Sequence, residues 1–243
     1  GLQHIPNFQH QTYCATSKMD KKNTGLVLLS ILLLGSILRI YGLGNESLWL
    51  DEAYTAEYTN NSIPEIIDGT YSNGTLYPQY FGKWAGSLPF YHILINLWIR
   101  IVGFSESNLR LFSAIFGIMS ILLIYLLGKL LFNYKVGLIA AFILSINYQH
   151  IFFSQEARMY MMATFFLSGV LYWFIVILNS IEDQPLRYER RRRIPDRVGN
   201  DIILFNLFVF LSFVTFYGSV FFIAAIYLYL LFKKQLKHLL LLL

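Results

Sequence analysis

Leu26–Leu43, with the sequence LVLLSILLLGSILRIYGL, is the stretch that decides the fold class. It is apolar over nearly the length that crosses the hydrocarbon core of a bilayer as one helix, about 20 residues. Arg39 near its end is expected to snorkel towards the lipid headgroups. Lys21 and Lys22 precede the stretch, and basic residues collect on the cytoplasmic side of membrane proteins. The first helix is therefore predicted to run from a cytoplasmic N-terminus to the outer side.

The composition of the whole chain also indicates a membrane protein. Of its 243 residues, 56% are hydrophobic and 14% are charged, against about 45–50% and about 25% in soluble domains. A soluble chain this apolar would lack the polar surface needed to cover itself. A single cysteine excludes a secreted disulfide scaffold. The net charge of +5 is better explained by basic cytoplasmic loops than by a nucleic-acid partner.

Five further apolar stretches follow the first helix. They are Leu88–Phe104, Leu109–Phe132, Val136–Phe153, Met159–Ile181 and Ile202–Phe232. If each crossed the membrane once, the arginine run Arg190–Arg193 would lie outside, against the positive-inside rule. The conflict disappears if Leu88–Phe104, the shortest stretch, lies at the outer interface as an amphipathic helix. The last stretch is too long for one helix and is predicted to break near Tyr217 and Gly218.

These assignments predict an all-α, polytopic integral membrane protein. It has about six transmembrane helices and an outer interfacial helix in the first outer loop, which covers about residues 44–107. Residues 1–18 are polar and aperiodic and precede Met19, so they are expected to be a disordered or non-native leader. The chain stops inside the apolar run Leu239–Leu243, so residues 19–243 are expected to be the N-terminal part of a longer membrane domain.

Two adjacent carboxylates, Asp51 and Glu52, stand just beyond the first helix, beside Trp49 and Tyr54. Partial burial there would raise a carboxyl pKa towards the range useful to a general base. The structural alternative is a helix N-terminus with acids in its first turn, where they stabilise the helix dipole. The residues alone leave both explanations open.

A second polar group lies between two predicted membrane helices, at their outer end. It contains Glu156, Arg158 and Tyr160, and ionisable residues at membrane depth are functional candidates because they are costly to keep there. On a helix, Glu156 and Tyr160 would share a face. The alternative is a structural ion pair between Glu156 and Arg158.

Arg110 and His92 are the remaining outer candidates. A guanidinium offers planar bidentate donors that suit a phosphate, although Arg110 could also be an arginine snorkelling at a helix end. His92 is more typical of packing than of metal binding, and no spacing of His, Cys and Asp matches a metal site. The sequence contains no phosphate loop and no dinucleotide fingerprint.

Four motifs occur in a recognisable order. They are LWLDEA at Leu48–Ala53, LPFY at Leu88–Tyr91, LRLFSA at Leu109–Ala114 and SQEARMY at Ser154–Tyr160. Together they resemble the dolichyl-phosphate-mannose protein mannosyltransferase family and its relatives, including the lipid A aminoarabinose transferases. These are glycosyltransferases of the C superfamily. Many relatives have Pro-Pro-Leu-Tyr-Tyr where this chain has LPFYH at Leu88–His92, so the chain departs from the family pattern at this helix.

The resemblance implies an enzyme that transfers a sugar, with inversion, from a dolichyl- or undecaprenyl-phosphate donor. The acceptor is a protein, lipid or glycan at the outer face, membrane lipid is a further partner, and nucleic acid is not. The residues assigned by the resemblance are Asp51 and Glu52 for catalysis, Arg110 and Arg158 for the donor phosphate, and Glu156, Tyr160 and His92 for the site lining. No cofactor is certain, and a divalent metal stays open. The fragment alone is expected to be inactive.

Two other classes stay open: a transporter or channel subunit, and a non-catalytic lipid-binding membrane protein. A pathway across the membrane would need ionisable residues at mid-membrane, whereas the candidate residues gather at one face. Within the enzyme class, an oligosaccharyltransferase is an alternative, but no separate motif for a sequon-binding site is evident. These comparisons favour the sugar transferase.

Overall fold

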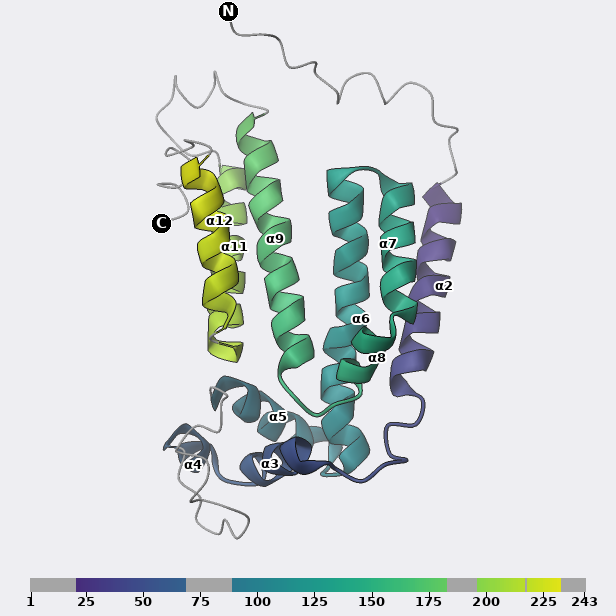
Figure 1. Cartoon of the computed structure of the whole chain (residues 1–243), viewed down its shortest axis with the longest axis vertical. Helices are drawn as coiled ribbons and strands as arrows, with labels where there is room; N and C mark the ends of the chain where they lie inside the picture. Colours follow the sequence, from purple (N-terminus) through teal and green to yellow (C-terminus); the bar gives the residue numbers. More distant parts are fainter. Residues whose placement is uncertain (1–20, 69–88, 183–195, 217, 233–243) are drawn as a thin grey trace, which may run out of the picture.

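The computed structural model describes residues 21–68, 89–182, 196–216 and 218–232, and all regular structure in these ranges is helical. Figure 1 shows two layers. Helices α2, α6, α7, α9, α11 and α12 run alongside one another as a bundle, and α3, α4 and α5 gather at one end of it. The all-helical membrane fold predicted from the sequence is confirmed.

Three helices are long and apolar enough to cross a membrane: α2 (Lys21–Ile40), α6 (Glu106–Leu131) and α9 (Tyr160–Glu182). A fourth span is possible if α7 (Tyr134–Ile146) and α8 (Tyr148–Ser154) are taken together. Helices α11 (Asp196–Thr215) and α12 (Ser219–Phe232) are apolar but shorter over the described residues. The total of six spans stays a prediction. The predicted break between the last two helices is confirmed, because α11 ends before and α12 begins after positions 217 and 218.

The apolar stretch Val136–Phe153, which is predicted to cross the membrane, is bent in the structure. Helices α7 and α8 meet at 62°, and Asn147 between them accepts a hydrogen bond from the backbone N–H of His150 at 2.9 Å. Asparagine is a preferred N-cap because its side chain satisfies a free amide of the first turn. The cap starts a new helix in a new direction, but the bent pair can still be counted as one span, so the crossing over Val136–Phe153 stays a prediction.

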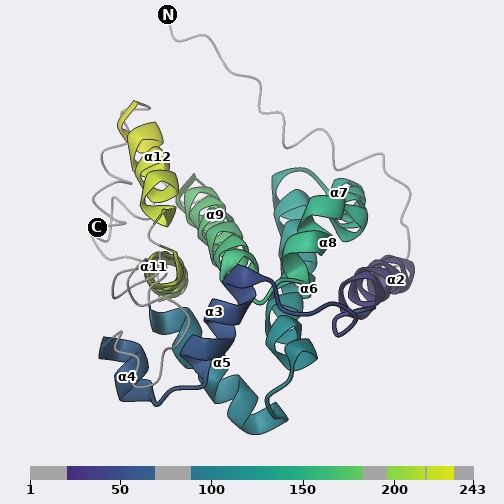
Figure 2. The ribbon, with the colours of Figure 1, turned by 60° about the horizontal axis from the view of Figure 1, so that its bottom comes forward.

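The segment predicted to be the first outer loop contains more helix than its composition suggested. It contains α3 (Leu50–Thr59), α4 (Ile63–Asp68) and α5 (Pro89–Val102). The sequence predicted the last of these and left a helix starting at Asp51 and Glu52 as an alternative. Helix α5 has 14 residues, or about 21 Å of helix, against about 30 Å of hydrocarbon core. It lies across the end of the bundle beside α3 and α4 (Figure 2). This arrangement agrees with the prediction that it does not cross.

An apolar cluster packs α5 and α3, here called the outer helices, against the bundle. Tyr91 and Ile95 of α5, Leu109 of α6, and Met162 and Phe166 of α9 are buried together. Asn96 of α5 also donates to the backbone at the end of α3. The outer helices therefore have a set position relative to α6 and α9, and that position builds the site.

Several predictions fall on residues that the structure leaves undescribed. They are the leader at 1–18, the arginine run Arg190–Arg193 and the final leucines at 239–243. One prediction about a described residue is wrong: Arg39 does not snorkel. Its side chain is fully buried, at 0% exposure, between α2 and the bent pair α7–α8.

Candidate functional site

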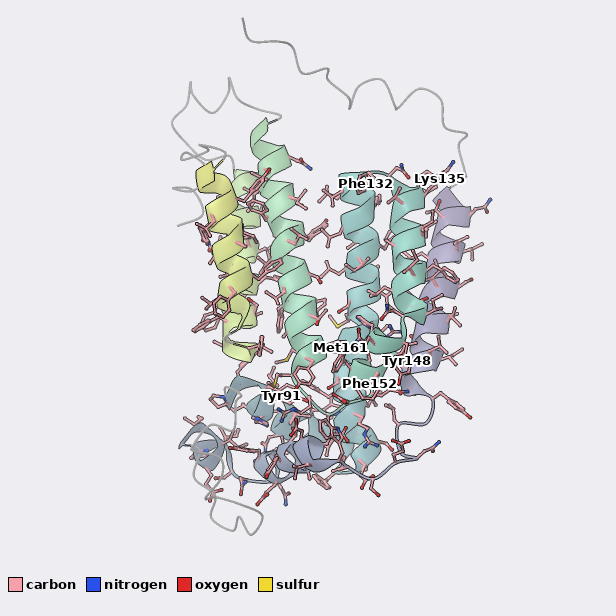
Figure 3. The ribbon with its side chains drawn as sticks, viewed as in Figure 1. Tyr91, Phe132, Lys135, Tyr148, Phe152 and Met161 are labelled. Carbon is pink, nitrogen blue, oxygen red and sulfur yellow. The ribbon has the colours of Figure 1, made fainter. Side chains whose placement is uncertain are left out.

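The candidate residues meet at the outer-helix end of the bundle, where α3, the start of α6 and the segment 155–159 come together. Figure 3 places Tyr91, Tyr148, Phe152 and Met161 near this level. Phe132 and Lys135 lie at the opposite end of the bundle (Figure 3). All seven residues predicted for the site belong to this end.

Glu52 joins three separate segments of the chain. Its side chain is 1% exposed, and its Oε1 accepts from Arg110 Nε at 2.9 Å and from the amide of Ala157 at 2.8 Å. Its Oε2 accepts from Arg110 Nη2 at 2.6 Å and from the amide of Trp49 at 3.4 Å. Both carboxylate oxygens are therefore engaged twice. Glu52 fits a positioning role better than the catalytic role expected of it.

Arg110 is equally engaged. Besides Glu52, its Nη1 donates to the carbonyls of Leu43 at 2.8 Å and Glu46 at 2.7 Å, and its Nη2 donates to that of Ser47 at 3.1 Å. An arginine has five N–H donors, and five hydrogen bonds are made. No donor remains for a phosphate, so the geometry disfavours the role expected of this residue. Arg110 instead holds the chain between α2 and α3 against α6.

Asp51 differs from its neighbour although both stand in the first turn of α3. Its side chain is 37% exposed, and its Oδ2 lies 3.9 Å from Arg158 Nη2. The structural alternative is thus partly correct, since both acids do sit at a helix N-terminus. Only Asp51, however, has a carboxylate that an incoming molecule can reach.

Arg158 is a cation of this site with unused donors among the described residues. Its side chain is 10% exposed, and its Nη1 makes one long hydrogen bond, 3.3 Å, to the carbonyl of Asp51. Its Nε is buried with no partner among the described residues. The Tyr160 ring lies 5.8 Å from its Cζ, a cation–π distance. A ring on one face and unused donors at the edge suit a planar guanidinium to an anion.

Glu156 lies in a turn, because residues 155–159 are not helical. The predicted helical face shared with Tyr160 is therefore wrong. Within the described residues Glu156 and Arg158 form no side-chain ion pair; instead the Arg158 amide donates to the Glu156 carbonyl at 2.8 Å. Burial, and then the negative charge of Glu52, raises the pKa of the Glu156 carboxyl to about 7. Its buried Oε2 has no partner in the described part of the chain.

His92 and Tyr160 line the neighbourhood of these groups. The His92 ring stacks on Tyr58 with centroids 4.8 Å apart and meets Tyr91 edge-on at 5.4 Å. Burial, and then the charge of Arg158, lowers the pKa of His92 to about 3, so the ring is neutral. Tyr160 packs edge-on against Phe153 at 5.4 Å. Both side chains shape the site without supplying charge.

Two positioning residues were not identified from the sequence. Gln155 donates from Nε2 to the carbonyls of Leu38 at 3.2 Å and Tyr41 at 2.9 Å. Ser113 donates to the carbonyl of Arg158 at 3.1 Å. Both residues lie inside the motifs LRLFSA and SQEARMY, and this position was the only indication of their role in the sequence. Across the described ranges, no group of three His, Cys, Asp or Glu side chains is placed to hold a metal.

Part of the chain is similar in sequence to known proteins. Residues 87–188 match the family described as dolichyl-phosphate-mannose-protein mannosyltransferase. The family resemblance drawn from the four motifs is confirmed for that part of the chain. An uncharacterised protein of Aquifex aeolicus (strain VF5) is 29% identical over 153 residues, covering 61% of this chain and 28% of the relative.

The fold matches crystal structures of the Archaeoglobus fulgidus oligosaccharyltransferase. The apo form has a TM-score of 0.71 at 22% identity, over 89% of this chain and 26% of that chain. The form tethered with an acceptor peptide containing the NVT sequon has a TM-score of 0.66 at 22% identity, over 88% and 26%. This chain is an integral membrane protein whose fold is like that of these oligosaccharyltransferase structures. It spans about a quarter of the length of these relatives.

Proposed function

We propose that the complete protein transfers a sugar from a polyprenyl-phosphate donor to an acceptor at the outer face of the membrane. One observation carries the proposal. The half-exposed carboxylate of Asp51 lies next to Arg158, a largely buried cation with unused donors. A base and an anion-binding group are thus adjacent at the end of a membrane bundle. The N-terminus is then cytoplasmic and the site extracytoplasmic or lumenal.

The chemistry needs two groups of this kind. The acceptor O–H or N–H attacks the anomeric carbon, the bond from that carbon to the phosphate oxygen breaks, and the polyprenyl phosphate leaves with the electron pair. Asp51 takes the acceptor proton, which raises nucleophilicity in the transition state. Arg158 stabilises the charge that grows on the departing phosphate. Attack opposite the leaving group inverts the anomeric centre.

The remaining residues hold these two in place. The Glu52–Arg110 pair joins the start of α3 to α6, and the bond from Ala157 to Glu52 draws the neighbouring segment to the same point. Asp51 and Arg158 each stand one residue from that junction. The polyprenyl chain lies among the apolar helices of the bundle.

The comparisons support this class of donor and acceptor. The matched family is described by a dolichyl-phosphate-mannose donor and a protein acceptor. The Archaeoglobus enzyme, which shares the fold, was crystallised with an acceptor peptide. A protein acceptor is therefore the first to test, ahead of lipid and glycan. The same assay, run with and without a chelator, tests whether a divalent metal is needed for transfer.

The test uses the complete reading frame expressed in membranes, with a panel of radiolabelled polyprenyl-phosphate sugars. Asp51→Asn should lower transfer by about 10²–10⁴-fold, the usual contribution of a general base. Glu57→Gln, on the same helix α3, is the matched control and should keep full transfer. Equal transfer by Asp51→Asn and wild type would refute the assigned base. No transfer from any donor by folded wild type would refute the class and favour transport or lipid binding.

A further inference from the structure

A buried arginine with no catalytic assignment lies in the membrane part of the bundle. Arg39 of α2 donates from Nη1 to the carbonyls of Gly35 and Ser145, both at 2.9 Å. Its Nη2 donates to the carbonyl of Leu144 at 3.0 Å and to His150 Nδ1 at 2.8 Å. The guanidinium thus bridges α2, the end of α7 and the middle of α8.

The partners explain how the charge is tolerated. Leu144 and Ser145 belong to the last turn of α7, whose carbonyls carry the negative end of the helix dipole. The Leu144 carbonyl also accepts from the Asn147 amide at 3.3 Å. Among the described residues, no carboxylate pairs with Arg39. Arg39 Nε and His150 Nε2 are also buried there without a partner.

This cluster is a costly way to join three helices. A buried charge without a counter-ion loses its hydration, and an apolar side chain of similar volume would often be as stable or more so. Ionisable groups kept inside a membrane protein are therefore functional candidates by default. Arg39 has a geometric property that an apolar residue lacks. Its planar fork makes directed hydrogen bonds on both sides of the α7–α8 bend.

The bend leads directly to the site. Helix α8 ends at Ser154, whose hydroxyl donates to the His150 carbonyl and lies 3.4 Å from His150 Nδ1. The next residue, Gln155, is tied to the carbonyls of Leu38 and Tyr41 at the end of α2. Helix α2 therefore holds α8 at two points, one before and one after its last turn. Figure 1 shows α8 turned under α7 towards α6.

We propose that Arg39 and His150 are positioning residues of the site. Together they hold the bend between α7 and α8, and so set where the segment carrying Glu156 and Arg158 lies. The proposal rests on the proposed function, because it treats that segment as part of a transferase site. Neither residue touches the reacting groups, and both act through the backbone that leads to them.

The first experiment measures the bend without any assay of activity. The complete protein, with its native cysteines replaced, carries spin labels at Ile139 on α7 and Phe152 on α8, which are both exposed. Electron–electron distance measurements should give one narrow distribution for wild type. Arg39→Leu and His150→Leu should broaden or shift it. Gln149→Leu, an exposed neighbour on α8, is the control and should leave it unchanged. Wild-type distributions in both leucine variants would overturn the proposal.

The second experiment links the bend to transfer. His150→Asn keeps an acceptor near the place of Nδ1 and should retain both the distribution and transfer. Arg39→Lys and Arg39→Leu should lower kcat by about a hundredfold, a loss expected of a misplacement of about 1 Å. A displaced bend with full transfer would overturn the positioning role. Absence of transfer in wild type would refute the proposed function instead, and the distance result would still decide whether the pair holds the bend.

Discussion

Substitution of Glu52 should lower the stability of the protein, whereas substitution of its neighbour Asp51 should lower only the activity. The Glu52→Gln substitution removes the negative charge from a pair whose side chains are 1% and 7% exposed. In either orientation it also turns an amide donor towards Arg110, since both carboxylate oxygens now accept from that side chain. Breaking a buried pair by removing one partner costs about 3–5 kcal/mol. One kcal/mol shifts Tm by roughly 2–4 °C in a protein of 150–250 residues and by less in a longer one, so Tm of the complete protein should fall by at most roughly 20 °C.

The matched substitution is Asp51→Asn. Its carboxylate is 37% exposed and lies 3.9 Å from Arg158, and exposed pairs contribute about 0–1 kcal/mol. Its Tm should stay within a few degrees of wild type while transfer is lost. Thermal unfolding of the complete protein in detergent, beside the transfer assay, checks both halves. Equal Tm for Glu52→Gln and wild type would show that the Glu52–Arg110 junction does not hold the site. A large fall in Tm of Asp51→Asn would refute the assignment of a structural role to Glu52 and a catalytic role to Asp51.

Three further predictions follow from single observations. The pKa of Glu156 is raised to about 7, so its ionisation penalises the folded state and Tm should fall as pH rises from about 4.5 to 7. Glu156→Gln should abolish this fall, and an unchanged profile of Tm against pH would contradict the prediction. Arg158→Lys should raise the KM for the donor about tenfold or more, because a lysine lacks the planar fork of a guanidinium, and Tm should be nearly unchanged. An unchanged KM in a donor titration would exclude a role of Arg158 in binding the donor phosphate. Gly137→Ala should lower the free energy of unfolding by about 1–3 kcal/mol, because a Cβ there would lie 2.6 Å from the Tyr125 carbonyl oxygen. Gly25→Ala is the control and should be neutral, since a Cβ there meets nothing within 4 Å. Equal Tm values for the two variants in thermal unfolding would refute this prediction.

The sequence by itself determined the membrane class, the long apolar helices α2, α6 and α9, and the separate shorter helix α5. These properties follow from local hydrophobicity and length, which are written in consecutive residues. It also indicated the end of the molecule where the polar motifs gather, because their order and their place between apolar stretches put them on one side.

Only the tertiary structure decided what each polar residue does there. Asp51 and Glu52 have the same chemistry and adjacent positions, yet one is reachable and the other is closed by Arg110, 58 residues away, and by the Ala157 amide, 105 residues away. Arg39 looked like a snorkelling residue until its bond to His150, 111 residues away, was visible. Burial and hydrogen-bond partners depend on contacts between distant segments, and local patterns of the chain do not contain them.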